Sequence, residues 1–224
     1  ANGLLTVAYK VPTIINLLAG IFSDAWQLSA FTEDQQGRTR FFSNVFASYQ
    51  ALIFTSASGL ILLCKWINRI LAYGEYYESW RFIPVLLLAT SFSCLVSFLG
   101  TIYMLEKKSF ATLVTTALGA GINIILNMTL IPNFGVQGGV VATLAGYLVV
   151  FTVRIIDTRR IVPLHWHPFK LLLNLALLGV QTYILLTFET GWLLPEIGLC
   201  LVVTALNFRL LLQNVQRLLM RRRS

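Results

Sequence analysis

Seven apolar segments dominate this sequence and constrain its fold more than any other feature. They cover approximately residues 4–30, 41–64, 82–104, 109–131, 136–156, 169–188 and 192–213. Each is long enough to cross the hydrocarbon core of a bilayer, which is ~30 Å thick and takes about 20 helical residues. In lipid, the backbone N–H and C=O groups must be bonded within the protein, which such a segment achieves as a helix. We therefore expect an all-α, polytopic transmembrane helix bundle with about seven spans, forming a single lobe.

Composition supports a membrane protein and argues against several other classes. Hydrophobic residues make up 57% of the chain and charged residues 12%, and the mean hydropathy is +0.75. A soluble domain has far less apolar sequence. The formal net charge of +8 is typical here of cytoplasmic loops and contact with anionic lipid, and does not indicate nucleic-acid binding. Cys64, Cys94 and Cys200 each stand alone in apolar runs, which indicates core residues and no disulfide or metal site.

Basic residues are distributed unequally between the two sides of the predicted bundle. Thirteen, including Arg154, lie on the side reached after the first, third, fifth and seventh segments. Lys65, Arg69 and Arg81 lie on the opposite side, and Lys10 inside a segment completes the total of 17. The positive-inside rule then predicts a cytoplasmic C-terminus and an outer N-terminus. No signal peptide opens the sequence to direct its N-terminus across the membrane. We therefore expect at least one further helix upstream.

The first segment carries two charges, Lys10 and Asp24. A lysine in the middle of a span costs at least ~2.5–3.5 kcal/mol, so Lys10 either reaches the interface or points into a wet cavity. At 100° per residue, the two charges lie within about 40° of each other. The face that they share also holds Thr13, Leu17, Gly20 and Ile21. We expect this face to look into protein or water and not into lipid, with Asp24 either interfacial or coupled to an ion.

Other polar residues in the spans leave two interpretations open. Asn123 and Asn127 lie one turn apart on the segment before the turn NFGVQ, which Pro132 and Gly135 delimit. They either form interhelical hydrogen bonds or line a cavity. Asn16 and Gln27 in the first segment have the same two possibilities. The connection at 65–81 is amphipathic, and its aromatic residues are predicted to anchor in the interface: Trp66, Tyr73, Tyr76, Tyr77 and Trp80.

Several stretches resemble one family. The N-terminal stretch resembles the segment that opens the second half of bacterial oligosaccharide flippases of the polysaccharide-exporter branch. Its sequence is GLLTVAYKVPTIINLLAGIFSDAWQLSA. There the pattern is close to GLY-x-VAYK-I-P, then a phenylalanine-bearing run and AWQLSA. EYYESWRFIPVLLLA and the long stretch from GTIYMLEKKSF to VVFTVR agree in order and spacing, so the resemblance covers most of residues 3–160. Asp24 departs from the pattern, because such proteins more often carry an uncharged polar residue there.

The resemblance implies a fourteen-helix carrier with two pseudo-symmetric lobes around a central cavity. This chain would hold helices eight to fourteen and lack the N-terminal lobe. The family moves undecaprenyl-diphosphate-linked oligosaccharide repeat units to the outer leaflet of the bacterial plasma membrane, and alternating access by rocking lobes is the usual mechanism of such repeats. Its partners would be the lipid-linked oligosaccharide, membrane lipids and the absent lobe. Lys10 is the candidate for attracting the diphosphate, and the other candidate cavity residues are Asn16, Gln27, Asn123 and Asn127.

Three other functions stay open at this point. A membrane enzyme acting on the same lipids would need a sizeable outer loop, and the predicted outer loops are short. His165 and His167 lack a third ligand, so they are weak as a zinc site, and no cofactor is expected. A multidrug exporter of the same superfamily would need a buried carboxylate for ion coupling, for which Asp24 is the available residue. The third open function is that of a membrane subunit that does not itself transport.

Overall fold

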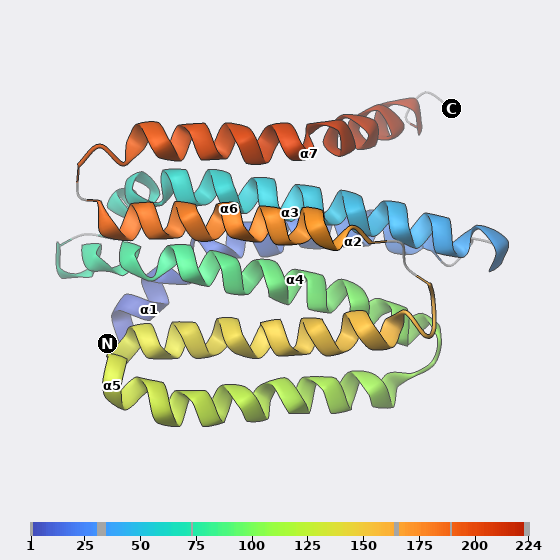
Figure 1. The fold of residues 1–224 in the computed structure, drawn as a ribbon, viewed down its shortest axis with the longest axis horizontal. Helices are drawn as coiled ribbons and strands as arrows, with labels where there is room; N and C mark the ends of the chain where they lie inside the picture. Colours follow the sequence, from blue (N-terminus) through green and yellow to red (C-terminus); the bar gives the residue numbers. More distant parts are fainter. Residues whose placement is uncertain (1, 31–34, 73, 164–165, 189, 222–224) are drawn as a thin grey trace.

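The computed structural model describes residues 2–30, 35–72, 74–163, 166–188 and 190–221, and these residues are almost entirely helical (Figure 1). The elements are α1 (Asn2–Ala8), α2 (Pro12–Ala30), α3 (Gln35–Leu71), the 3₁₀-helix η1 (Gly74–Arg81), α4 (Ile83–Leu105), α5 (Ser109–Thr158), α6 (Pro168–Thr187) and α7 (Leu193–Arg221). No strand occurs in the described ranges. The expected all-α helix bundle is confirmed.

Within the described residues, six helices are long and apolar enough to cross a membrane. They are Gly37–Leu71, Ile83–Leu105, Ser109–Phe134, Val136–Thr158, Pro168–Thr187 and Leu193–Leu210, and they overlap the second to seventh predicted segments. The chain is a multi-pass membrane protein.

The first predicted segment is not one continuous helix. It breaks between Ala8 and Pro12 into the short α1 and the longer α2. Pro12 lacks an N–H and disfavours helical geometry at the residue before it, so the chain turns there. Lys10 therefore lies in a turn. The sequence analysis had placed it within a spanning helix.

Helix α5 is a hairpin of two arms that reverses at Gly135 (Figure 1). The backbone of Gly135 has φ 57° and ψ −136°, a conformation that residues with a Cβ rarely adopt. The arms pack closely because Gly119 on the first faces Val150 on the second, where a Cβ would clash. The predicted helix pair around the turn NFGVQ is confirmed.

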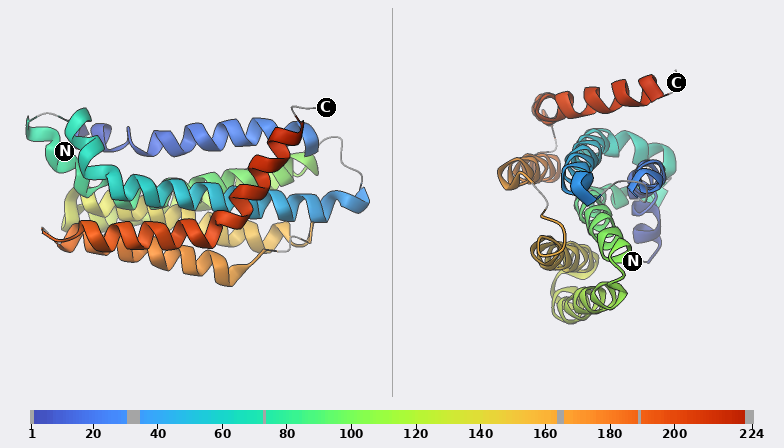
Figure 2. Two further views of the ribbon diagram at one scale, coloured as in Figure 1. Left: turned by 90° about the horizontal axis from the view of Figure 1, so that it is seen from above. Right: turned by 90° about the vertical axis from the view of Figure 1, so that its right-hand side faces the viewer.

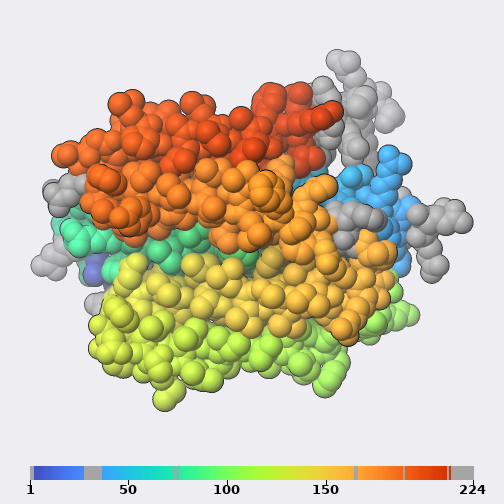
Figure 3. Space-filling model, in the orientation of Figure 1, coloured from blue at the N-terminus to red at the C-terminus, as the bar shows by residue number. Residues whose placement is uncertain are grey.

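Helix α4 is the centre of the bundle and packs against α2, α3 and α5. Aromatic rings from α2, α3 and α4 fill the core between these helices, with Trp26 4.7 Å and Phe46 5.2 Å from Phe98 between ring centroids. The end-on view shows the α5 hairpin on one side of α4, and α6 and α7 beside α3 (Figure 2). The α5 hairpin, α6 and α7 form the face of the molecule seen in Figure 3.

Candidate functional site

The face of α2 predicted from helical periodicity is a surface of the described chain. Its members are all exposed: Lys10, Thr13, Leu17, Gly20, Ile21 and Asp24. The opposite face of α2 is buried against α3 and α4, and it holds Val11, Ile15, Ala19 and Trp26. Helical periodicity thus grouped these residues on one face, as the structure has them.

Lys10 lies at the break between α1 and α2. Its carbonyl accepts a hydrogen bond from Thr13 Oγ1 at 2.5 Å, and its backbone N–H donates to Val7 O at 3.1 Å. Helix α2 starts two residues later, at Pro12, and a helix N-terminus carries a partial positive charge. A cationic side chain and the positive end of a helix thus occupy the same turn.

The other α2 candidates differ in their surroundings. Asn16 is exposed, but its Oδ1 accepts a hydrogen bond from Cys94 Sγ of α4 at 3.6 Å. Gln27 is half-buried near the other end of the helix, and Asp24 is exposed. An exposed carboxylate does not meet the requirement for a buried ion-coupling residue.

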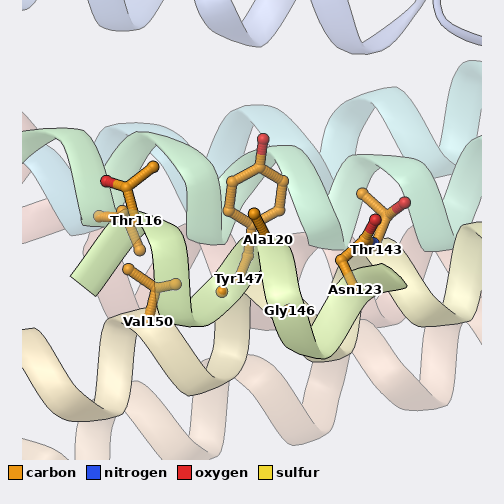
Figure 4. A pocket seen from close by; sticks show the side chains of 9 residues that line it. Thr116, Ala120, Asn123, Thr143, Gly146, Tyr147 and Val150 are labelled. Atoms are coloured by element: carbon orange, nitrogen blue, oxygen red, sulfur yellow. The ribbon is translucent and has the colours of Figure 1, made fainter. Parts of the chain in front are cut away.

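A cavity of about 270 Å³ lies between α4 and the two arms of α5 (Figure 4). Asn123 lines it, together with Thr116 from the same arm and Thr143 and Tyr147 from the other arm. Asn127 donates from Nδ2 to Asn123 Oδ1 at 2.9 Å, which is a bond within one helix and not between helices. Asn123 lines this cavity, whereas Asn127 is not among its lining residues.

The structure divides the candidate residues between two places. Asn16 and Gln27 belong to α2 and Lys10 to the turn before it, whereas Asn123 and Asn127 belong to the first arm of α5. Helix α4 packs against both elements, and the cavity beside Asn123 has no α2 residue in its lining. The described chain does not gather them into one cavity.

Arg154, which the sequence analysis counted among the basic residues of the predicted cytoplasmic side, is a buried residue of the described chain. It lies inside the second arm of α5 and is 3% exposed. Its guanidinium donates from Nε to Thr115 Oγ1 at 3.0 Å and from Nη1 to Val96 O at 2.7 Å. From Nη2 it donates to Thr116 Oγ1 at 2.9 Å and to Thr112 O at 3.3 Å. Because Val96 and Thr116 also line the cavity, a buried positive charge adjoins it.

The space for this guanidinium depends on neighbours from α4. A Cβ on Gly100 would lie 2.7 Å from Arg154 Nη1, so a larger residue there would require the guanidinium to shift. Tyr103 packs its ring 5.9 Å from Arg154 Cζ and donates a hydrogen bond to Asp157 Oδ2 at 2.8 Å. The threonines at 112, 115 and 116, spaced for one helix face, are the sequence signal that could have located this site.

Glu196 is a buried carboxylate that the sequence analysis did not consider. It is fully buried at the start of α7, where Gln181 Nε2 of α6 donates to its Oε2 at 3.0 Å. Ser58 of α3 donates to Gln181 Oε1 at 2.8 Å. Glu196 Oε1 has no hydrogen-bond partner among the described atoms. Asp24 is therefore not the only carboxylate available for ion coupling, and Glu196 meets the burial requirement better.

The described ranges contain no group of three His, Cys, Asp or Glu side chains that could hold a metal ion. His165 lies outside these ranges, as does Tyr73 among the predicted interface anchors.

No family model and no curated protein matches the sequence. A solved structure that matches is described as "Lipid II flippase MurJ, inward closed conformation", with a TM-score of 0.67 and 18% sequence identity. The match covers 95% of this chain and 48% of MurJ. This chain has the fold of about half of MurJ. At this level of identity the fold is what the two share, and the expected likeness to one lobe of a flippase is confirmed. MurJ is a flippase and not an enzyme.

Proposed function

We propose that this chain is the C-terminal lobe of a carrier that flips undecaprenyl-diphosphate-linked oligosaccharide repeat units to the outer leaflet of the bacterial plasma membrane. The exposed face of α2 is the main observation in its support, because it presents a cation at a helix break on a lobe with a flippase fold. The C-terminus would lie in the cytoplasm, as the distribution of basic residues predicts.

The chemistry of such a substrate matches this face. Its head group is polar and anionic, so the path across the membrane must be hydrated and locally cationic, while the lipid tail can stay in the bilayer. Lys10 and the N-terminus of α2 supply positive charge in one turn. Further along the exposed side of the helix, Asn16 can donate from its amide nitrogen to a sugar hydroxyl, and Thr13 can accept from one through its hydroxyl oxygen.

Transport would require a second lobe opposite this face. Broken helices and two rocking lobes are typical of alternating-access carriers. One lobe can line only half of a central path, so we expect this chain alone not to transport. The candidate cavity beside Asn123 would then be an accessory site within the lobe and not the central path.

The substrate is tested with the complete carrier in proteoliposomes that contain labelled lipid-linked oligosaccharide in one arm and lipid II in the other. We expect Lys10→Ala to slow flipping at least about tenfold, equivalent to ~1.4 kcal/mol of lost charge attraction, and Lys10→Arg to retain most of the rate. Lys108→Ala, at an exposed turn at the other end of the bundle, is the matched control. A normal flipping rate in Lys10→Ala would contradict the role of Lys10 in attracting the diphosphate. Faster flipping of lipid II than of the lipid-linked oligosaccharide would identify lipid II as the substrate.

One observation favours an ion-coupled exporter as a second candidate. Glu196 is a carboxylate buried between membrane-spanning helices, and ionisable residues in such places commonly serve proton or ion pathways. This function predicts export of a small organic cation that depends on an ion gradient and is lost in Glu196→Gln. Export that persists in this variant would exclude it.

A further inference from the structure

A second cavity, of about 490 Å³, lies where the C-terminal end of α3, η1 and the end of α6 meet. This is the end of the bundle that also holds the Gly135 turn (Figure 1). All the charged residues in its lining are basic, and most of the others are aromatic. The basic and tryptophan residues of the lining are Lys65, Arg69, Arg81, Trp66, Trp80 and Trp192.

Lys65 is held between two indole rings. Its Nζ lies 4.4 Å from the ring centroid of Trp80 and 4.5 Å from that of Trp192. Trp66 packs on Trp192 with 5.4 Å between ring centroids. A cation on an aromatic face is attracted by the ring quadrupole, which holds Lys65 at the wall of the cavity.

The η1 wall of the cavity is fastened to α3 by buried hydrogen bonds. Asn68 Nδ2 donates to Tyr77 O at 2.7 Å, and Ser79 Oγ donates to Asn68 Oδ1 at 2.9 Å. Asn68 and Ser79 are both fully buried. These bonds hold the η1 wall in place on α3, which lowers the ordering cost of binding.

The charge balance of the cavity favours an anion. Glu78 pairs with Arg81 at 2.8 Å on the exposed side, and the buried Glu196 interacts electrostatically with Lys65. Arg69 is exposed at the cavity and adds a further positive charge. In the lining of this cavity as the structure describes it, Lys65, Arg69 and Arg81 are the charged side chains, and all of them are basic. Leucines and a phenylalanine from the end of α6 complete the wall and give it an apolar side.

We propose that this cavity binds the anionic phosphate group of a membrane lipid, with the sugar or glycerol of the head group against the indole rings. Arginine and lysine bind phosphate oxygens, and aromatic rings at a membrane interface contact the less polar part of a head group. The lipid is either a lipid-linked sugar, which rests on the proposed function, or an anionic phospholipid, which does not. The shared chemistry is a lipid-borne phosphate with net negative charge.

The experiment is native mass spectrometry of the full chain in detergent with short-chain phosphatidylglycerol, undecaprenyl phosphate or zwitterionic phosphatidylcholine. We expect both anionic lipids to bind, and the double variant Arg69→Gln/Arg81→Gln to weaken their binding about tenfold or more, with no change for phosphatidylcholine. Trp80→Phe keeps an aromatic ring but weakens the cation–π contact, so it should weaken binding by a smaller factor.

Arg159→Gln is the matched control, since Arg159 also stacks on a tryptophan, with its Cζ 4.8 Å from the ring of Trp166, at the other end of the bundle. Equal binding by the native chain and the double variant, or an equal loss in Arg159→Gln, would overturn the proposal. Tighter binding of undecaprenyl phosphate identifies a substrate site, and tighter binding of phosphatidylglycerol identifies a phospholipid site. This readout does not depend on transport, so it can fail while the proposed flippase function holds, or the reverse.

Discussion

Single residues in this chain show that charge can be buried in a helix bundle when neighbouring groups supply enough hydrogen bonds. Arg154 has five N–H donors, and four hydrogen bonds join it to threonine side chains and backbone carbonyls. None of these acceptors is charged. The fit depends on the planar fork of arginine, which reaches α4 and the first arm of α5 at once.

The planar guanidinium group, which bonds several acceptors at once, predicts that Arg154→Lys destabilises the protein although it conserves the charge. A lysine ammonium cannot bond the same four acceptors, and each buried group left unsatisfied costs about 1–3 kcal/mol. We therefore expect a lower midpoint in thermal unfolding of the detergent-solubilised protein. Arg159→Lys changes an exposed arginine and should leave the midpoint nearly unchanged. Equal midpoints for the two variants would contradict this account.

Glu196 supplies a second residue-scale prediction. Gln181→Leu removes the donor to its carboxylate and should cost about 1–3 kcal/mol, because Glu196 would stay buried without a hydrogen bond. Replacing both partners, as Gln181→Leu/Glu196→Leu, removes the orphaned group and should recover much of the loss. Thermal unfolding of the single and double variants tests this. A double variant less stable than Gln181→Leu would show that the carboxylate stabilises the bundle in another way.

At the scale of elements, breaks in the helices fix where the candidate residue Lys10 lies and how the arms of α5 pair. The turn before Pro12 places Lys10 at the start of α2, and the reversal at Gly135 folds α5 back on itself. In both places the local sequence fixes the break. Pro12 interrupts the helix by lacking a donor, and Gly135 permits a positive φ.

The hairpin predicts a clear difference between two glycines of α5. Gly135→Ala forces a Cβ into a conformation with φ 57° and should destabilise the protein by about 1–3 kcal/mol. Gly121→Ala is the control, because its added Cβ meets open space in a helical arm and should be neutral or slightly stabilising. Chemical or thermal unfolding measures both. A neutral Gly135→Ala would mean that the turn relaxes at no cost.

At the scale of the whole molecule, the surface has two kinds of exposed apolar residue. On the spanning helices, residues such as Leu172 on α6 are exposed as a lipid-facing surface requires. Leu17 and Ile21 are exposed on α2 beside Lys10 and Asp24, a mixture that lipid does not favour. The proposed second lobe would cover this mixed face or enclose water against it.

A labelling experiment on the complete carrier distinguishes these surfaces. In a background without its own cysteines, we expect Leu17→Cys to react with a charged maleimide, because its face opens to water in at least one state. Leu172→Cys, which is exposed to a similar extent on the spanning helix α6 and which we expect to face lipid, should react little, since charged reagents do not enter the hydrocarbon core. Failure of Leu17→Cys to react in every state would place the α2 face in lipid or in a permanently closed interface.

The sequence by itself indicated six of the spanning segments, the helix pair that reverses at Gly135 and the face that Lys10 and Asp24 share. These features depend on the transfer of apolar residues into lipid, on the 3.6-residue period and on the backbone preferences of glycine and proline, all of which are local. The tertiary structure alone decided that Arg154 is buried, that Glu196 meets Gln181, and that Asn123 faces α4 and not Lys10. Each of these depends on how helices distant in sequence are rotated and packed, and hydropathy in one segment carries no information about the residues that another segment brings beside it.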